Sequence, residues 1–126
     1  MFLYLTLGTN DAARARRFYD PTLATIGLVP LQPGADECSY GPPGASDPVL
    51  YVGKPFDGQP ATRGNGTMLA LTAATRAAVH AFHTAALAHG GTDEGAPGLR
   101  YAENFFSCYV RDPDGNKLSA VCKKPE

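Results

Sequence analysis

The histidines of this chain, His80, His83 and His89, are all in its second half. His80 and His83 stand at positions i and i+3, so on a helix they would share one face and could together hold a metal ion at the surface. The sequence contains no HExxH or CxxC pattern and no second histidine cluster to complete such a site. We therefore interpret them as solvated or partly packed helix histidines.

Carboxylates offer acid–base chemistry, and several stand where strands are expected to end: Asp36, Glu37, Asp93, Glu94 and Glu103. Such a group could point into the mouth of a cavity, although a solvated turn or edge position is its more common role. Hydroxyl groups are the neutral alternative, since Tyr4, Ser107, Tyr109 and Ser119 could donate hydrogen bonds to a carbonyl. No histidine is expected near Ser119, so a nucleophilic triad is not indicated.

The three cysteines, Cys38, Cys108 and Cys122, form no CxxC pair, and their odd number argues against a disulfide framework. We interpret them as small buried hydrophobic residues in a reducing, cytoplasmic environment. The net charge is −1 and Lys and Arg are scattered, so nucleic acid is not an expected partner. The N-terminus MFLYLTLGTND lacks a basic segment and its apolar run is short, which predicts neither a signal peptide nor a membrane span.

Hydrophobic periodicity and turn signals divide the chain into two similar halves. The first half predicts a strand over 2–8, a helix over 11–26, and strands over 28–32, 36–41 and 48–53. The second half predicts a strand over 66–72, a helix over 75–89, and strands over 91–95, 103–111 and 117–123. A connector rich in Pro and Gly, residues 54–65, separates them. Pro21 falls inside the first helix, where we expect a kink or a break.

Shifting the sequence by 64 residues aligns its two halves, which indicates an internal repeat. This offset pairs Leu5 with Leu69, Leu7 with Leu71, Phe18 with Phe82, Leu23 with Leu87, Ala24 with Ala88 and Gly27 with Gly91. The same offset pairs two candidate helix N-caps, Asp11 and Thr75, and it places Tyr4 on Met68. The chain therefore reads as two copies of one unit made of a strand, a helix and three strands.

A hairpin closes the chain, in the run YVRDPDGNKLSAVC over residues 109–122. Pro113 presets a turn conformation and Gly115 can adopt positive φ, so Asp112 and Asp114 are expected first as turn formers. Beyond the turn, period two places Ser119 and its alternate neighbours on one face and the intervening residues on the other.

The hairpin and the repeat together resemble the vicinal oxygen chelate superfamily, which includes glyoxalase I, bleomycin-resistance proteins and extradiol dioxygenases. The segments GTNDAARARRFYD and KPFDGQPATRGNG look like one bacterial branch of it. The resemblance covers nearly the whole chain. It implies an α+β fold in a single domain, 1–126, with two tandem βαβββ modules (about 1–54 and 66–124, joined by 54–65) that form a curved mixed sheet around a concave cavity, helices outside.

The concave face follows from alternation along the strands. If Leu5, Leu7, Leu69 and Leu71 pack towards the helices, their neighbours point to the opposite face, where members of the family bind ligands. The pocket candidates are Tyr4, Thr6, Met68, Ala70, Ser107, Tyr109, Ser119 and Val121.

The resemblance also implies where a metal would bind. In the family the hairpin motif usually ends DPDGNxxE, and its glutamate joins histidine or glutamine ligands on a divalent ion. The corresponding positions here are Tyr4, Met68 and Ser119. At neutral pH these side chains offer neither an imidazole nor an anionic oxygen, so we predict no bound metal and no other cofactor.

We therefore expect a cytoplasmic protein that binds a small organic molecule in its concave pocket, without contact to nucleic acid or membrane. The resemblance implies a homodimer, as is common among bleomycin-resistance proteins that sequester a ligand. The alternative is a glyoxalase-type lyase, isomerase or dioxygenase that works through atypical ligands or through Tyr and Ser as electrophilic donors. A structural or regulatory subunit is a third reading.

Overall fold

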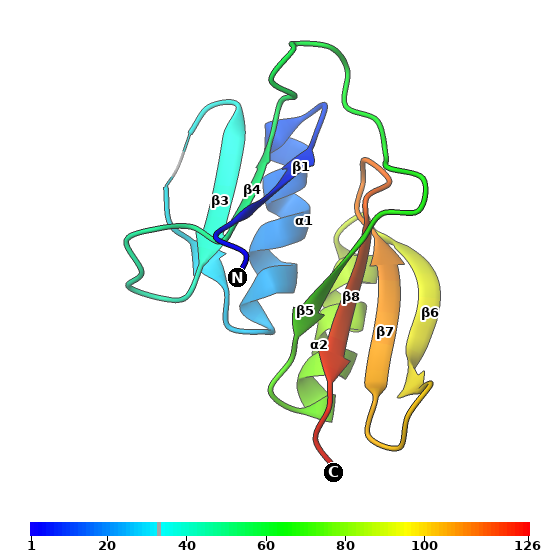
Figure 1. Cartoon of the computed structure of the whole chain (residues 1–126). Coiled ribbons are helices and arrows are strands. Elements are labelled where there is room, and N and C mark those ends of the chain that lie inside the picture. Colours follow the sequence, from blue (N-terminus) through cyan, green and yellow to red (C-terminus); the bar gives the residue numbers. More distant parts are fainter. Residues whose placement is uncertain (33) are drawn as a thin grey trace.

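A computed structural model describes residues 1–32 and 34–126 of the chain and divides them into two similar units (Figure 1). The first unit contains β1 (Leu5–Gly8), α1 (Ala12–Ala24), β2 (Val29–Pro30), β3 (Glu37–Gly41) and β4 (Leu50–Gly53). The second contains β5 (Met68–Thr72), α2 (Arg76–Ala88), β6 (Thr92–Leu99), β7 (Phe106–Arg111) and β8 (Lys117–Cys122). Each unit has the order βαβββ that the repeat predicted.

The strands of each unit form their own four-stranded mixed sheet with the same topology. The orders are β1-β4-β3-β2 and β5-β8-β7-β6, and in both the first strand runs parallel to the last. Even the register repeats, because Leu5 pairs with Leu50 in the first sheet and Leu69 pairs with Leu118 in the second. The α+β fold predicted as two tandem βαβββ units is confirmed.

Both helices begin at the predicted N-caps. Asp11 accepts a hydrogen bond from the Arg14 amide at 3.0 Å, and Thr75 accepts one from the Ala78 amide at 3.0 Å. A break at Pro21 does not occur, because α1 is continuous from Ala12 to Ala24. Buried side chains anchor the helix on both sides of the proline, and their packing offsets the missing backbone hydrogen bond; they include Phe18, Tyr19, Thr22 and Leu23.

Several strand boundaries differ from the prediction. Residues 2–4 precede β1, because β1 pairs only with β4 and that ladder begins at Leu5. The strand predicted over 28–32 shrinks to the two residues of β2. β6 is longer than the predicted 91–95, since register shifts near Gly95 and Gly98 let it continue to Leu99. β7 begins at Phe106, and residues 103–105 belong to the preceding loop.

Alternation along the strands separates a packed face from an open face in each sheet. Leu5, Leu7, Leu69 and Leu71 pack against the core, as predicted. The helices cover that side of the sheets in Figure 1, where Phe18 of α1 and Phe82 of α2 are fully buried. Each such burial stabilises the fold by roughly 1.5–3 kcal/mol. The helices leave the opposite faces uncovered, although Ser107 and Ser119 on the second of these faces are buried by their neighbours.

The two units meet through their helices. α1 packs against α2, whereas the strands of the two sheets make no close backbone contact with one another within the described residues. The two sheets are therefore separate ladders and not one continuous sheet. No helix of the described part is long and apolar enough to cross a membrane.

Candidate functional site

The open face of the second sheet is formed by residues of β5, β8 and β7. It carries six of the predicted pocket residues: Met68, Ala70, Ser119, Val121, Ser107 and Tyr109. Ser119 lies at its centre, because its register partners are Ala70 on one side and Tyr109 on the other. The Ser119 side chain is fully buried, and its hydroxyl has no hydrogen-bond partner among the described residues. The face therefore contains a donor and acceptor that the fold leaves free.

Tyr109 is surrounded by polar groups on this face. The Ser107 hydroxyl donates to the Tyr109 hydroxyl at 3.3 Å. The Arg100 guanidinium carbon lies 5.1 Å from the centre of the Tyr109 ring, and Lys117 Nζ lies 5.6 Å from it, both within cation–π range. The neighbouring Tyr101 phenol has a raised pKa, mainly because of a side-chain hydrogen bond with Tyr109.

The remaining two predicted residues lie in the first unit, Thr6 in β1 and Tyr4 just before it. Thr6 pairs in register with Tyr51 of β4, as Ala70 pairs with Ser119 in the second sheet. Tyr51 is thus the counterpart of Ser119. The Tyr4 and Tyr51 rings meet edge to face with centroids 5.3 Å apart. Sequence reasoning missed Tyr51, although applying the repeat to strands 48–53 and 117–123 would have placed it on this face.

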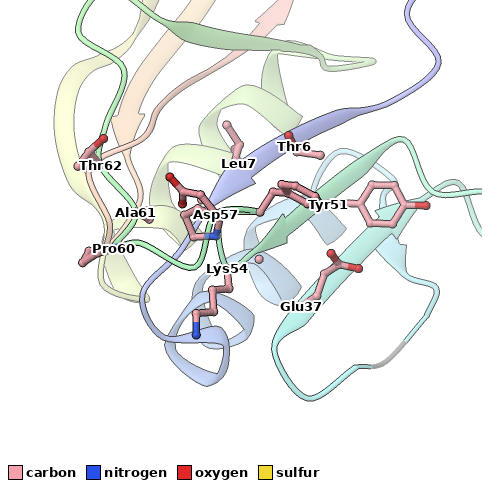
Figure 2. A pocket seen from close by; sticks show the side chains of 13 residues that line it. Thr6, Leu7, Glu37, Tyr51, Lys54, Asp57, Pro60, Ala61 and Thr62 are labelled. Atoms are coloured by element: carbon pink, nitrogen blue, oxygen red, sulfur yellow. The ribbon is translucent and has the colours of Figure 1, made fainter.

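A hollow of about 560 Å³ opens beside Thr6 and Tyr51 (Figure 2). Glu37, Lys54 and Asp57 contribute charged groups to its wall, and Pro and Phe residues of the connector contribute apolar surface. The volume suits a small organic molecule. Of the carboxylates considered from the sequence, Glu37 lines this hollow.

Other carboxylates are engaged or exposed elsewhere. Asp93 lies 2.9 Å from His83 Nε2, and this hydrogen bond lowers the pKa of Asp93. Glu94 pairs with Arg111 at 2.8 Å. Asp36 and Glu103 are exposed.

The three positions at which the family resemblance implies metal ligands do not fit a divalent ion. Met68 and Ser119 belong to the second sheet, whereas Tyr4 precedes β1 of the first, and no strand contact joins those sheets within the described residues. A thioether, an alcohol and a phenol are poor ligands for such an ion at neutral pH. In the described part of the chain, no group of three or more His, Cys, Asp or Glu side chains converges.

The predicted histidine positions are ordinary helix positions. His80 packs against the Phe106 ring with centroids 5.4 Å apart, and His83 pairs with Asp93. His89 caps α2, where its Nδ1 lies 2.8 Å from the Ala85 carbonyl oxygen.

The cysteines are buried free thiols in the structure. Burial raises the pKa of Cys38 and of Cys108, which disfavours the reactive thiolate. Neither thiol is a suitable nucleophile.

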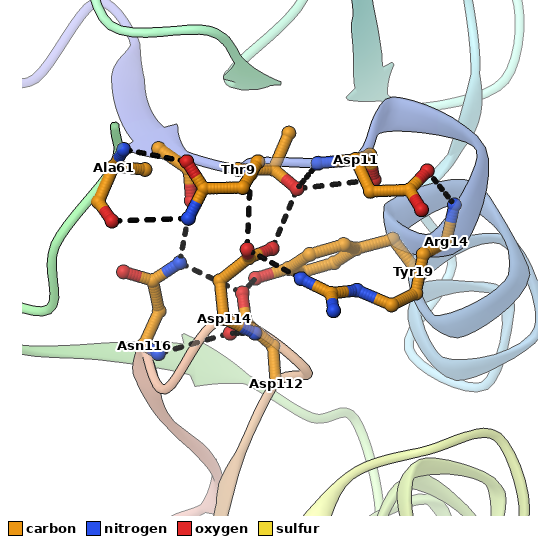
Figure 3. Close-up of polar contacts among 10 residues, drawn as sticks. Thr9, Asp11, Arg14, Tyr19, Ala61, Asp112, Asp114 and Asn116 are labelled. Atoms are coloured by element: carbon orange, nitrogen blue, oxygen red, sulfur yellow. Dashed lines mark hydrogen bonds and ion pairs between the residues drawn. The ribbon is translucent and has the colours of Figure 1, made fainter. Parts of the chain in front are cut away.

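A polar network connects the closing hairpin to the first unit (Figure 3). Asp112 Oδ1 accepts hydrogen bonds from the amides of Asp114 and Asn116, which confirms its predicted role in the turn. Asp112 also accepts from the Tyr19 hydroxyl at 2.5 Å, and Asp114 pairs with Arg14 at 2.7 Å. Burial raises the pKa of Asp112 despite these donors, and the pKa of Tyr19 is raised by burial and by Asp112.

The sequence matches the family model of the Glyoxalase/Bleomycin resistance protein/Dioxygenase superfamily over residues 2–119. Among curated proteins, none matches the chain. Among solved structures, a glyoxalase/bleomycin resistance protein from Albidiferax ferrireducens T118 is 37% identical, with a TM-score of 0.87 and 99% of each chain covered.

Two more distant structures share the fold alone. A glyoxalase/bleomycin resistance protein/dioxygenase family enzyme from Burkholderia phytofirmans PsJN is 17% identical, with a TM-score of 0.73 over 96% of this chain and 97% of that one. Lactoylglutathione lyase from Agrobacterium tumefaciens is 19% identical, with a TM-score of 0.63 over 97% of this chain and 92% of that one. The family model and the repeated topology agree, and the chain belongs to the glyoxalase/bleomycin resistance protein/dioxygenase superfamily.

Proposed function

We propose that this protein binds a small organic molecule on the open faces of its two sheets, without a metal ion. The observation that carries the proposal is the unpartnered hydroxyl of Ser119 at the centre of the second face. A buried polar group without a partner is costly, so such a group is retained where something else satisfies it. The hollow of about 560 Å³ beside Tyr51 supplies volume of the right size on the first face.

We further propose that the binding protein is a homodimer. In this dimer the first face of one protomer would lie against the second face of the other. Apolar side chains that such packing would cover are exposed here, with Phe2 at 80%, Tyr4 at 52% and Met68 at 43% of full exposure. Three buried free thiols support a reducing, cytoplasmic location.

The alternative is a glyoxalase-type lyase, isomerase or dioxygenase reaction through atypical groups. One observation favours it: the Tyr109 phenol lies between two cations, where it could donate a hydrogen bond to a developing oxyanion. The fold alone does not decide the reaction.

A ligand screen tests the binding proposal. Amide chemical shifts would be followed while a library of small organic molecules is added to the purified protein. Molecules that bind should shift the amide signals of open-face residues in β1, β4, β5, β7 and β8. Met68→Trp should weaken their binding, because the larger side chain covers part of the second face. Leu87→Trp on the exposed side of α2 is the matched control. Perturbations confined to other surfaces, or hits that Met68→Trp leaves unchanged, would overturn the proposal.

A further inference from the structure

The open face of the second sheet carries two cations beside one phenol. Arg100 and Lys117 flank the Tyr109 ring at 5.1 Å and 5.6 Å. Among the described residues neither of these cations forms an ion pair. Two unpaired cations beside one phenol create a site with positive potential, and such a site attracts an anion.

The acidic groups nearest to this face along the chain are already used. Glu94 of β6 pairs with Arg111 at 2.8 Å, and Asp93 pairs with His83 at 2.9 Å. The first pair neutralises Arg111, and the Asp93 carboxylate, which is also stabilised by the charge of Arg100, forms no ion pair with Lys117. The hollow on the first sheet differs, because Glu37 and Asp57 line it together with Lys54. The two faces have therefore diverged in charge although their strands share one register.

The two cations are held in different ways. The Arg100 guanidinium donates to the carbonyl oxygens of Ala96 at 2.6 Å and Gly98 at 3.3 Å, and also to that of Ser107. Most of its donor capacity is thus occupied by backbone, and its position is fixed. Lys117 makes no such hydrogen bond among the described residues, so its ammonium keeps its three donors available.

Hydroxyl groups gather at the same place. The Ser107 hydroxyl donates to Tyr109 at 3.3 Å, while the Ser119 hydroxyl is buried and unpartnered opposite Tyr109 in the register. Tyr101 has φ of 62°, the one positive φ outside glycine in the described chain. That conformation is sparsely populated for a tyrosine and places its phenol beside that of Tyr109.

The loop that carries Tyr101 is braced in this conformation. The Arg100 amide donates to the Phe105 carbonyl at 2.8 Å, and the Ala102 amide donates to the Arg100 carbonyl at 2.7 Å. The Tyr101 and Phe105 rings meet edge to face at 5.4 Å. A strained residue held by such contacts is typical of a binding or catalytic position.

We propose that the molecule bound on the second face carries a carboxylate, which Lys117 holds by charge and the Tyr109 hydroxyl holds by a hydrogen bond. This inference rests on the proposed binding function and adds the chemical class of the ligand. A carboxylate accepts several hydrogen bonds and carries one negative charge, which matches one ammonium with free donors beside neutral hydroxyls. A phosphate dianion would need more free cationic donors than the fixed Arg100 leaves.

The test uses three probes with one ring and different head groups: benzoate, benzamide and phenylphosphonate. Benzoate should shift the amides of Tyr109 and Ser119, and benzamide, which is neutral, should not. Lys117→Gln should weaken benzoate binding by roughly 10- to 100-fold, the usual effect of losing a charge-assisted hydrogen bond. Tyr109→Phe is the second variant and keeps the ring between the two cations. Lys123→Gln, at an exposed position just beyond β8, removes the same charge and should leave binding unchanged.

Each other outcome contradicts one statement. Preference for phenylphosphonate, equal effects of Lys117→Gln and Lys123→Gln, or benzamide binding as well as benzoate would overturn the carboxylate assignment. Another outcome is that none of the three probes binds while neutral molecules from the screen still perturb the open faces. In that case the carboxylate assignment is wrong and the proposed binding function stands. If no molecule perturbs either face, the binding function itself is wrong.

Discussion

The Tyr19 hydroxyl donates a hydrogen bond to Asp112 Oδ2 at 2.5 Å, and this bond joins the first unit to the second. Tyr19 lies in the middle of α1, whereas Asp112 opens the turn between β7 and β8, and both side chains are buried. Bonds of this kind, together with the α1–α2 contact, hold the two units together.

Tyr19→Phe should therefore destabilise the protein by about 1–3 kcal/mol, since it leaves a buried carboxylate with one donor fewer. Urea unfolding followed by circular dichroism would measure the loss. Tyr40→Phe is the matched control, because Tyr40 donates to Asp20 at 2.6 Å within the first unit. We expect Tyr19→Phe, and not Tyr40→Phe, to separate the unfolding of the two units. Equal effects on cooperativity would contradict the role of the Tyr19–Asp112 bond.

Asp112 should also make stability depend on pH. Burial raises its pKa in the folded protein above the unfolded value of about 3.9, so the folded state binds the proton more tightly. This contribution to stability is complete below the unfolded pKa and is lost as the pH rises through the raised folded pKa. Asp112→Asn cannot titrate. The unfolding free energies of the parent and the variant would be measured from about pH 3 to about pH 7. As the pH rises, the variant should become more stable relative to the parent. The opposite trend would show that the hydrogen bonds to Asp112 affect its pKa more than burial does.

Ser119→Ala tests the free hydroxyl on the second face. Because Ser119 Oγ is buried without a partner, its removal should leave the unfolding free energy unchanged or raise it by up to about 1 kcal/mol. Ser39→Ala is the control, since the buried Ser39 hydroxyl donates to the Gln32 carbonyl at 3.2 Å and should cost about 1 kcal/mol when lost. Thermal melting compares the two. A marked loss of stability in Ser119→Ala would mean that the hydroxyl is satisfied in solution.

Tyr4→His, Met68→His and Ser119→Glu together test the three implied ligand positions. Two imidazoles and one carboxylate suit Zn²⁺ or Ni²⁺. Tyr4 precedes β1 in the first unit and the other two belong to the second sheet, so we expect these side chains to meet between two protomers. Metal should then bind tightly only to the triple variant and should shift it from monomer to dimer, as followed by calorimetry and analytical ultracentrifugation. Tight binding by a monomer would place all three ligands within one chain.

The fold could be predicted from the sequence because the features that specify it are local and occur in both halves of the chain. Asp11 and Thr75 cap the helices as expected, and the leucines of β1 and β5 alternate as expected. Tyr51 was missed because β4 is a strand of four residues without a motif, so its place on the open face follows only from its pairing with Thr6 or from its counterpart in β8.

Arg100 and Tyr101 were missed for a different reason. The prediction ran a strand through 103–105 and ended the previous one at 95, whereas register shifts near Gly95 and Gly98 extend β6 and create a loop at 100–105. Such shifts leave no periodic pattern in the sequence. The carbonyl oxygens that hold the Arg100 side chain belong to the extended part of β6 and to β7, so their use could not be predicted without these shifts.

The separation of the two sheets has a kinetic consequence. Every strand pairs within its own unit, so each sheet can assemble from one continuous stretch of chain without waiting for the other. The bonds between the units, by contrast, join residues far apart in sequence, such as Thr9 and Arg14 with Asp114. Closing these long loops comes last, so we expect two early folding nuclei and a late docking step. A Tyr19→Phe substitution should then accelerate unfolding and leave the folding rate nearly unchanged.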